Sequence, residues 1–126
     1  MLMANQENRF FTEEEYLTEI GLDVNENVLE RIYADDIKPS DKLKIEFVFV
    51  TDTRDKADRL VSKIITEYPI YSNIEVEKSD DYWEIYGATN EIVMALSDIN
   101  NWNQALWDLG YQVDCKLDGW QVNASN

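Results

Sequence analysis

The side chains best suited to covalent chemistry lie near the end of the sequence. The stretch VDCKLDGW contains the single cysteine of the chain, Cys115, next to Lys116 and between Asp114 and Asp118. A thiol in a charged setting can act as a nucleophile once it ionises. Cys115 alternates with apolar residues two positions away on either side, as in a strand that faces a core. Burial and acidic neighbours both oppose ionisation, so we expect Cys115 to be structural rather than catalytic.

A second group of reactive side chains consists of carboxylates in a predicted hairpin. Its members are Glu75, Glu77, Asp80, Asp81 and Glu84. Paired carboxylates can hydrolyse glycosidic bonds, but nothing in the sequence indicates a raised pKa or a sugar cleft. A solvated surface is the commonest role of such a group. The functional alternative is that these five side chains face a binding partner.

Two tyrosines accompany this acidic group. Tyr82 and Tyr86 fall on one face of the predicted hairpin, where aromatic rings stack on bases in some RNA-binding sheets. The surrounding carboxylates would repel phosphate groups. We therefore expect these rings to pack beneath helices from the N-terminal part of the chain.

The composition narrows the possible chemistry further. The 126 residues include 26 acidic and 11 basic side chains and no histidine, which gives a net charge of −15. The lack of histidine removes Ser-His-Asp and Cys-His catalysis and histidine-bearing metal sites, so we expect no metal and no cofactor. Phosphate contacts need lysine and arginine, so direct binding to nucleic acid is not expected. The charge fits a well-hydrated surface or a surface that binds a basic protein.

Length and hydropathy predict one ordinary domain. Hydrophobic residues make up 44% of the chain, enough for a core. No segment approaches the roughly 18 apolar residues of a membrane span, and the start, MLMANQENRF, lacks the order of a signal peptide. A single cysteine fits a reducing compartment, so we expect a cytoplasmic protein. The oligomeric state stays open.

Periodicity and end signals define the predicted elements, after a loose start at residues 1–11. Thr12 and Glu15 form a capping box, and Asp52 or Thr53 can cap a later helix. The predicted elements are a helix at 12–22, a helix at 23–37, a strand at 43–51, a helix at 52–68, a hairpin at 73–89, a helix at 90–110 and a strand at 111–117.

From residue 43 onwards the predicted order is β-α-β-β-α-β. This order predicts an α+β fold, a ferredoxin-like βαββαβ sandwich with a four-stranded antiparallel sheet whose first and third strands are central. One or two short helices precede it. Residues 1–40 are expected to pack as a helical segment on the domain at 41–126 and to cover part of the second sheet face. The predicted core residues are Phe47, Phe49, Leu60, Ile64, Trp83, Ile85, Ile99, Leu106 and Val113.

The chain from about residue 43 to 122 resembles the regulator of ribonuclease activity B family of ribonuclease E inhibitors. The resemblance rests on IEFVFVTDTRDKADRL, on the long helix before LGYQVDCKLDGW, and on the closing residues Asp118, Gly119 and Trp120. It implies a ferredoxin-like domain in a small acidic cytoplasmic protein that binds the endoribonuclease and modulates RNA decay. Independently of the family, Asp118 and Gly119 are expected to form a turn that swings Trp120 onto the edge of the core.

These observations favour a non-catalytic, acidic protein-binding regulator with a basic protein partner, possibly a ribonuclease. A toxin-neutralising immunity protein would use the same physics. A small enzyme that works through its carboxylates or through Cys115 is the alternative from another class.

Overall fold

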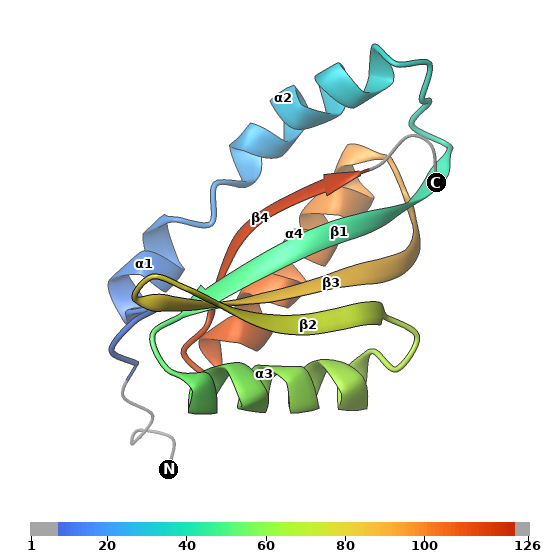
Figure 1. Cartoon of the computed structure of the whole chain (residues 1–126). Coiled ribbons are helices and arrows are strands. Elements are labelled where there is room, and N and C mark those ends of the chain that lie inside the picture. The colour runs from blue at the N-terminus through green and yellow to red at the C-terminus, as the bar shows by residue number, and fades with distance from the viewer. Residues whose placement is uncertain (1–7, 123–126) are drawn as a thin grey trace.

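The computed structural model describes residues 8–122 of the chain (Figure 1). The elements of that range, in chain order, are α1 (Glu13–Thr18), α2 (Leu22–Tyr33), β1 (Lys42–Thr51), α3 (Arg54–Glu67), β2 (Ser72–Ser79), β3 (Tyr82–Val93), α4 (Leu96–Tyr111) and β4 (Lys116–Val122).

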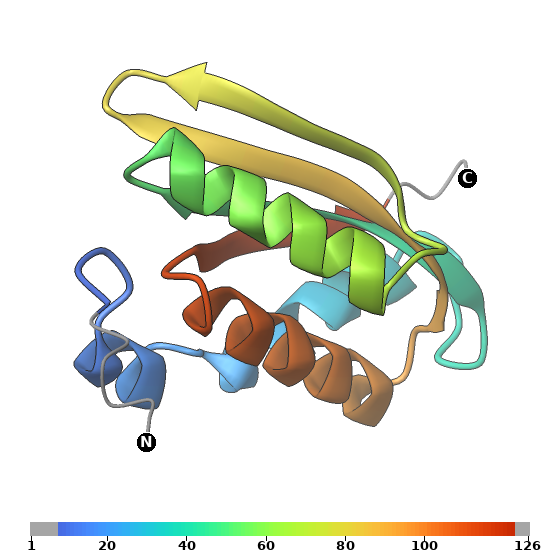
Figure 2. The same ribbon diagram turned by 90° about the horizontal axis from the view of Figure 1, so that it is seen from below.

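The four strands form one antiparallel sheet in the spatial order β2-β3-β1-β4. β1 and β3 are central, as the chain order predicts, and the fold is the ferredoxin-like α+β arrangement. Figure 2 shows α3 and α4 on the same side of the sheet. The opposite side, called here the open face, carries no helix from the part of the chain that the structure describes.

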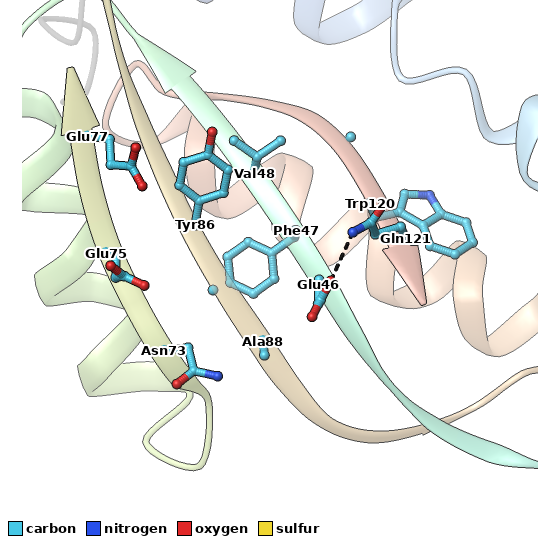
Figure 3. A pocket seen from close by; sticks show the side chains of 12 residues that line it. Glu46, Phe47, Val48, Asn73, Glu75, Glu77, Tyr86, Ala88, Trp120 and Gln121 are labelled. Carbon is cyan, nitrogen blue, oxygen red and sulfur yellow. Dashed lines mark hydrogen bonds between the residues drawn. The ribbon is translucent and has the colours of Figure 1, made fainter. Parts of the chain in front are cut away.

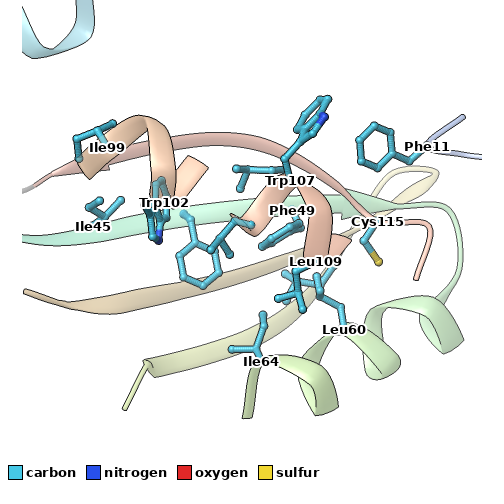
Figure 4. Packing of buried hydrophobic residues seen from close by; sticks show 14 of the residues in the cluster. Phe11, Ile45, Phe49, Leu60, Ile64, Ile99, Trp102, Trp107, Leu109 and Cys115 are labelled. Carbon is cyan, nitrogen blue, oxygen red and sulfur yellow. The ribbon is translucent and has the colours of Figure 1, made fainter. Parts of the chain in front are cut away.

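The core lies between the sheet and the helices (Figure 4). Alternation places Ile45, Phe47 and Phe49 of β1 on the helix side, where their exposure is 2% or less. Of the predicted core, Trp83 and Val113 are only partly buried. The fully packed members of the predicted set are Phe47, Phe49, Leu60, Ile64, Ile85, Ile99 and Leu106.

Local sequence signals explain where two helices begin. The hydroxyl of Thr12 accepts a hydrogen bond from the backbone of Glu15, whose carboxylate accepts one from the backbone of Thr12, so the predicted capping box is present. Thr53 caps α3 by accepting a hydrogen bond from the backbone of Lys56. Each cap satisfies a backbone N–H group that the helix itself leaves without a partner.

The prediction of a helix from residue 90 is wrong. β3 runs on to Val93, and α4 begins at Leu96 after Ala95. The register between β1 and β3 shifts near Ile45, and beyond this irregularity the strands pair again as far as Val93. The backbone of Ile45 donates a hydrogen bond to the hydroxyl of Thr89, which bridges the irregularity at 2.9 Å. Asn90 therefore lies in a strand and not at a helix cap.

The last strand also begins later than predicted, at Lys116. α4 continues through Gly110 to Tyr111, so the glycine does not end the helix. A Cβ atom on Gly110 would come within 2.3 Å of the carbonyl oxygen of Cys115, so only glycine allows this close approach of the following loop. Residues 112–115 then turn the chain, with Asp114 at a φ of 59°.

The segment before β1 packs on the helix side of the sheet. The start at residues 1–11 was expected to be loose, and its first seven residues lie outside the described range. Residues 8–11 pack on the fold, where Phe11 is fully buried beside Trp107 (Figure 4). α2 packs against α4 and contributes the buried Leu29 to the core. The expectation that these helices cover the second sheet face is therefore wrong, because the apolar edge of α2 finds its partner on α4 instead.

Candidate functional site

The open face carries an unusual concentration of carboxylates on a rigid sheet. Glu77 pairs with Glu84 across β2 and β3, and Glu75 pairs with Tyr86. Directly opposed residues of an antiparallel pair point to the same side of the sheet. Figure 3 shows Glu75 and Glu77 of β2 close to Tyr86, and Glu46 of β1 beside Gln121 of β4, to which it is hydrogen-bonded. We call the four glutamates Glu46, Glu75, Glu77 and Glu84 the acidic face.

A shallow groove with a volume of about 580 Å³ runs across this face (Figure 3). All four strands contribute to it. Glutamates make up three of its twelve lining residues, and none is lysine or arginine. The lining residues are Glu46, Phe47, Val48, Asn73, Glu75, Glu77, Tyr86, Gly87, Ala88, Gly119, Trp120 and Gln121.

Gly87 lies in the floor of the groove, and its lack of a side chain makes room on the helix side of the sheet. A Cβ atom on Gly87 would lie 2.5 Å from the ring of Phe47 and 2.7 Å from the Cδ1 of Ile74, distances that no real side chain keeps. The glycine thus lets the core side chains approach the central strand closely from the helix side.

The phenol of Tyr86 reports the electrostatics of the groove. Its hydroxyl donates a 2.8 Å hydrogen bond to the carboxylate of Glu84. This bond, followed by partial burial and by the charges of Glu84, Glu77 and Asp118, raises the pKa of Tyr86 to about 12. A negative charge on the ring oxygen is disfavoured there. Of these causes, the charges of Glu84, Glu77 and Asp118 would also favour a positive charge brought by a ligand.

The predicted binding residues divide into two places. Glu75, Glu77 and Glu84 lie together on the open face. Asp80 and Asp81 form the turn between β2 and β3, and their exposed side chains lie outside the groove. Glu46 was missing from the predicted set, although its alternation with Ile45 and Phe47 already put it on the second face of β1. Its place in the same groove as Glu75 and Glu77, between Ala88 of β3 and Gln121 of β4, depends on the strand order.

The sequence predicted that Tyr82 and Tyr86 pack beneath N-terminal helices, and this prediction is wrong. Tyr86 lines the open groove. Tyr82 is about half exposed, and its ring meets Phe10 edge-on at 5.7 Å between ring centres. Residues 8–11 therefore touch one end of the hairpin, and no described part of the N-terminal segment lines the groove.

Cys115 is buried just before β4. Its exposure is 0%, and its sulfur lies 3.5 Å from the carbonyl oxygen of Lys56. Burial raises the pKa of the Cys115 thiol to about 12. A thiol that stays protonated and is shielded from solvent is a poor nucleophile.

The turn predicted at Asp118 and Gly119 is wrong, because both residues lie within β4. The register between β1 and β4 shifts at Asp118, where β4 has one residue more than its partner. Trp120 pairs with Phe47 and faces the helix side, where its indole N–H donates a 3.2 Å hydrogen bond to the buried Asn25. Strand alternation, and not a turn, brings Trp120 onto α2 and α4.

Asp114 is a residue whose importance the sequence did not reveal. It is 5% exposed and accepts hydrogen bonds from the backbone N–H groups of Arg9, Phe10 and Phe11. It also lies 2.7 Å from the ammonium group of Lys56. Burial by itself would raise the pKa of Asp114, but the Lys56 ion pair and the backbone hydrogen bonds outweigh burial and lower it. This carboxylate holds the N-terminal segment against the body of the fold.

Other kinds of site find no support between residues 8 and 122. No group of three or more histidine, cysteine, aspartate or glutamate side chains within that range can hold a metal ion. No helix there is both long enough and apolar enough to span a bilayer.

Comparison with known proteins identifies the family of the chain. No match is found among curated proteins. A family model described as regulator of ribonuclease activity B matches residues 22–122, from the start of α2 to the end of β4. The match spans the whole sheet, the acidic face and the closing Asp118, Gly119 and Trp120. The chain belongs to the regulator of ribonuclease activity B family.

Proposed function

We propose that this protein regulates a ribonuclease, with ribonuclease E as the target, by binding the enzyme directly through the acidic face. The observation that carries the proposal is the sheet face that no described helix covers. There Glu46, Glu75, Glu77 and Tyr86 line a groove without a basic side chain, and Glu84 accepts a hydrogen bond from Tyr86. The family of the chain supplies the kind of partner. The groove supplies the chemistry, which suits lysine or arginine side chains on the partner.

The acidic face favours binding in two ways. The net charge of −15 attracts a basic surface over a long distance and raises the rate of encounter. The groove then offers several acceptors on one rigid element, so a basic segment can pair with them without ordering a loop first. An enzyme that handles RNA needs basic surfaces for phosphate, and such a surface is a matching partner.

The geometry also supports regulation without catalysis. The thiol of Cys115 is buried and its pKa is raised to about 12, which removes the strongest candidate nucleophile. Glu77 and Glu84 face solvent across a shallow surface rather than an enclosed cleft that could exclude water.

Cleavage of a fluorescent RNA by purified ribonuclease E tests the proposal. We expect the protein to slow cleavage, and the triple variant Glu75→Lys, Glu77→Lys and Glu84→Lys to lose this effect. The matched control carries the same charge change on the N-terminal helices, as Glu14→Lys, Glu26→Lys and Glu30→Lys, where all three side chains are exposed. Circular dichroism must first show that both variants stay folded.

Loss of inhibition in the hairpin variant, with inhibition retained in the control, is the expected result. Equal inhibition by the hairpin variant and by the unchanged protein would contradict the acidic face as the binding site. Failure of the unchanged protein to bind ribonuclease E at low salt would contradict the choice of target.

A further inference from the structure

The two outer strands of the sheet differ in how their free edges are protected. β4 is irregular at Asp118, and its Trp120 is tied to α2 through Asn25. β2 stands at the opposite end of the sheet and pairs with β3 alone. Among the described residues no strand pairs with the outer edge of β2, although α3 runs beside it on the helix side of the sheet (Figure 1). An edge strand of this kind presents unpaired backbone N–H and C=O groups to any extended segment that approaches.

The free edge of β2 is regular over a useful length. Its register with β3 shifts between Ser72 and Glu75, around Asn73 with its φ of 57°. From Glu75 to Ser79 the pairing continues without a further shift. Five residues approach the usual length of a strand in a sheet, so another segment has room to pair there.

The side chains along this edge alternate in chemistry as well as in direction. Glu75 and Glu77 are exposed and point to the open face, while Ile74 and Val76 are partly buried and point to the helix side. Cross-strand neighbours on one face of a sheet contact each other directly. A strand added beside β2 would therefore place every second side chain against Glu75 and Glu77. The others would lie against Ile74 and Val76 and, near the end of β2, against Lys78.

α3 adds one exposed apolar side chain, Ile65, near this edge. Arg54, at the start of α3, lies over the ring of Trp83, whose strand partner is Lys78 at the end of β2. Ile65 follows Arg54 by eleven residues, which is about three helical turns, so it lies on the same flank of the helix. Ile65 is 57% exposed. Its exposed side chain can cover the apolar residues of an added strand.

We infer that an extended segment of the partner, with basic and apolar residues in alternation, adds to the sheet as a fifth strand beside β2. Its basic side chains lie against Glu75 and Glu77, its apolar side chains lie against Ile74, Val76 and Ile65, and its backbone pairs with the free edge. This inference rests on the proposed function and specifies the form of the partner. Charge complementarity selects the segment, and backbone pairing fixes its direction and register.

A synthetic peptide of alternating arginine and valine, about ten residues long, is a direct probe. In an added strand the N–H groups that face β2 belong to every second residue, hence to all the arginines or to all the valines. Two further peptides, N-methylated on the arginines or on the valines, keep the charge and the side chains but each lose one set of N–H donors. Fluorescence anisotropy gives the three affinities, and hydrogen exchange reports on the backbone amides of β2.

We expect one methylated peptide to bind about tenfold more weakly or worse, and the other to bind nearly as well as the parent peptide. Alternate amides between Glu75 and Ser79 should gain protection from exchange. Equal affinities for all three peptides, or no binding at low salt, would overturn the strand-addition inference. The proposed function fails separately, if the Glu75→Lys, Glu77→Lys and Glu84→Lys protein still binds and inhibits ribonuclease E.

Discussion

Replacing Asp114 by asparagine should destabilise the protein far more than the loss of an ordinary surface charge. Asp114 is 5% exposed, and it accepts three backbone hydrogen bonds and the Lys56 ion pair. Asparagine tolerates the left-handed backbone of this position, so the change removes the charge and keeps the turn. In the variant, however, the amide nitrogen of asparagine takes the place of one carboxylate oxygen, and this nitrogen cannot accept hydrogen bonds from the N–H groups that face it.

The expected cost follows from these contacts. The amide nitrogen cannot accept the hydrogen bonds that Arg9 and Lys56 donate to one oxygen of Asp114, and each such charge-assisted bond contributes about 1.5–3 kcal/mol. Lys56 keeps a second partner, Asp52, at 2.8 Å. Breaking a buried ion pair by removing one member costs about 3–5 kcal/mol, and the alternative partner places this case at the lower end, about 3 kcal/mol. A matched control is Asp55→Asn on α3, whose exposed pair with Arg59 contributes less than about 1 kcal/mol.

Urea unfolding followed by tryptophan fluorescence measures both changes, and hydrogen exchange at Phe10 and Phe11 reports whether the N-terminal segment is released. The pKa of Asp114 is lowered in the folded protein, so its stabilisation is complete above the unfolded pKa of about 3.9 and is lost as the pH falls through the folded value. The difference between the variant and the unchanged protein should therefore shrink below about pH 4. Equal costs for the Asp114 and Asp55 variants at neutral pH would refute this reasoning.

Three further predictions concern single side chains. Trp120→Ala should lower the free energy of unfolding by about 3 kcal/mol, and an unchanged unfolding midpoint would show that the ring does not pack as described. Cys115 should react with a thiol reagent at neutral pH only as fast as the protein unfolds, so rapid labelling of the native protein would contradict its burial. Glu84→Gln should lower the pKa of Tyr86 from about 12 towards 10, as read by NMR of ring-labelled tyrosine; an unchanged pKa would exclude Glu84 as the cause.

The parts of the fold that the sequence predicted well are those in which a local pattern matches the tertiary environment. The alternation in β1 and the apolar stripe of α3 identify those elements and their buried sides. The same alternation placed Glu75, Glu77 and Glu84 on one hairpin face. The fold class followed because two helices and four strands in this order have few ways to cover one side of a sheet.

The errors come from contacts between residues distant in the sequence. Gly110 was predicted to end the helix. The structure shows that glycine is needed there because the backbone of Cys115 passes too close for a side chain. Asn90 was predicted to cap a helix. The pairing of β3 with β1 continues past it to Val93, so Asn90 lies in the sheet. The cluster around Asp114 joins residues more than a hundred positions apart, and no local pattern marks it. Glu46 joined the acidic face only once the strand order was known.

The salt dependence of the association rate with ribonuclease E tests the central claim most directly. The two triple lysine variants, on the hairpin and on the N-terminal helices, have the same net charge, so only the location of the change differs between them. The Debye length falls from about 30 Å at 0.01 M salt to about 8 Å at 0.15 M, which weakens steering. We predict that the hairpin variant associates more slowly than the control at low salt and shows a flatter salt dependence. Equal association rates for the two variants at every salt concentration would contradict binding through the acidic face.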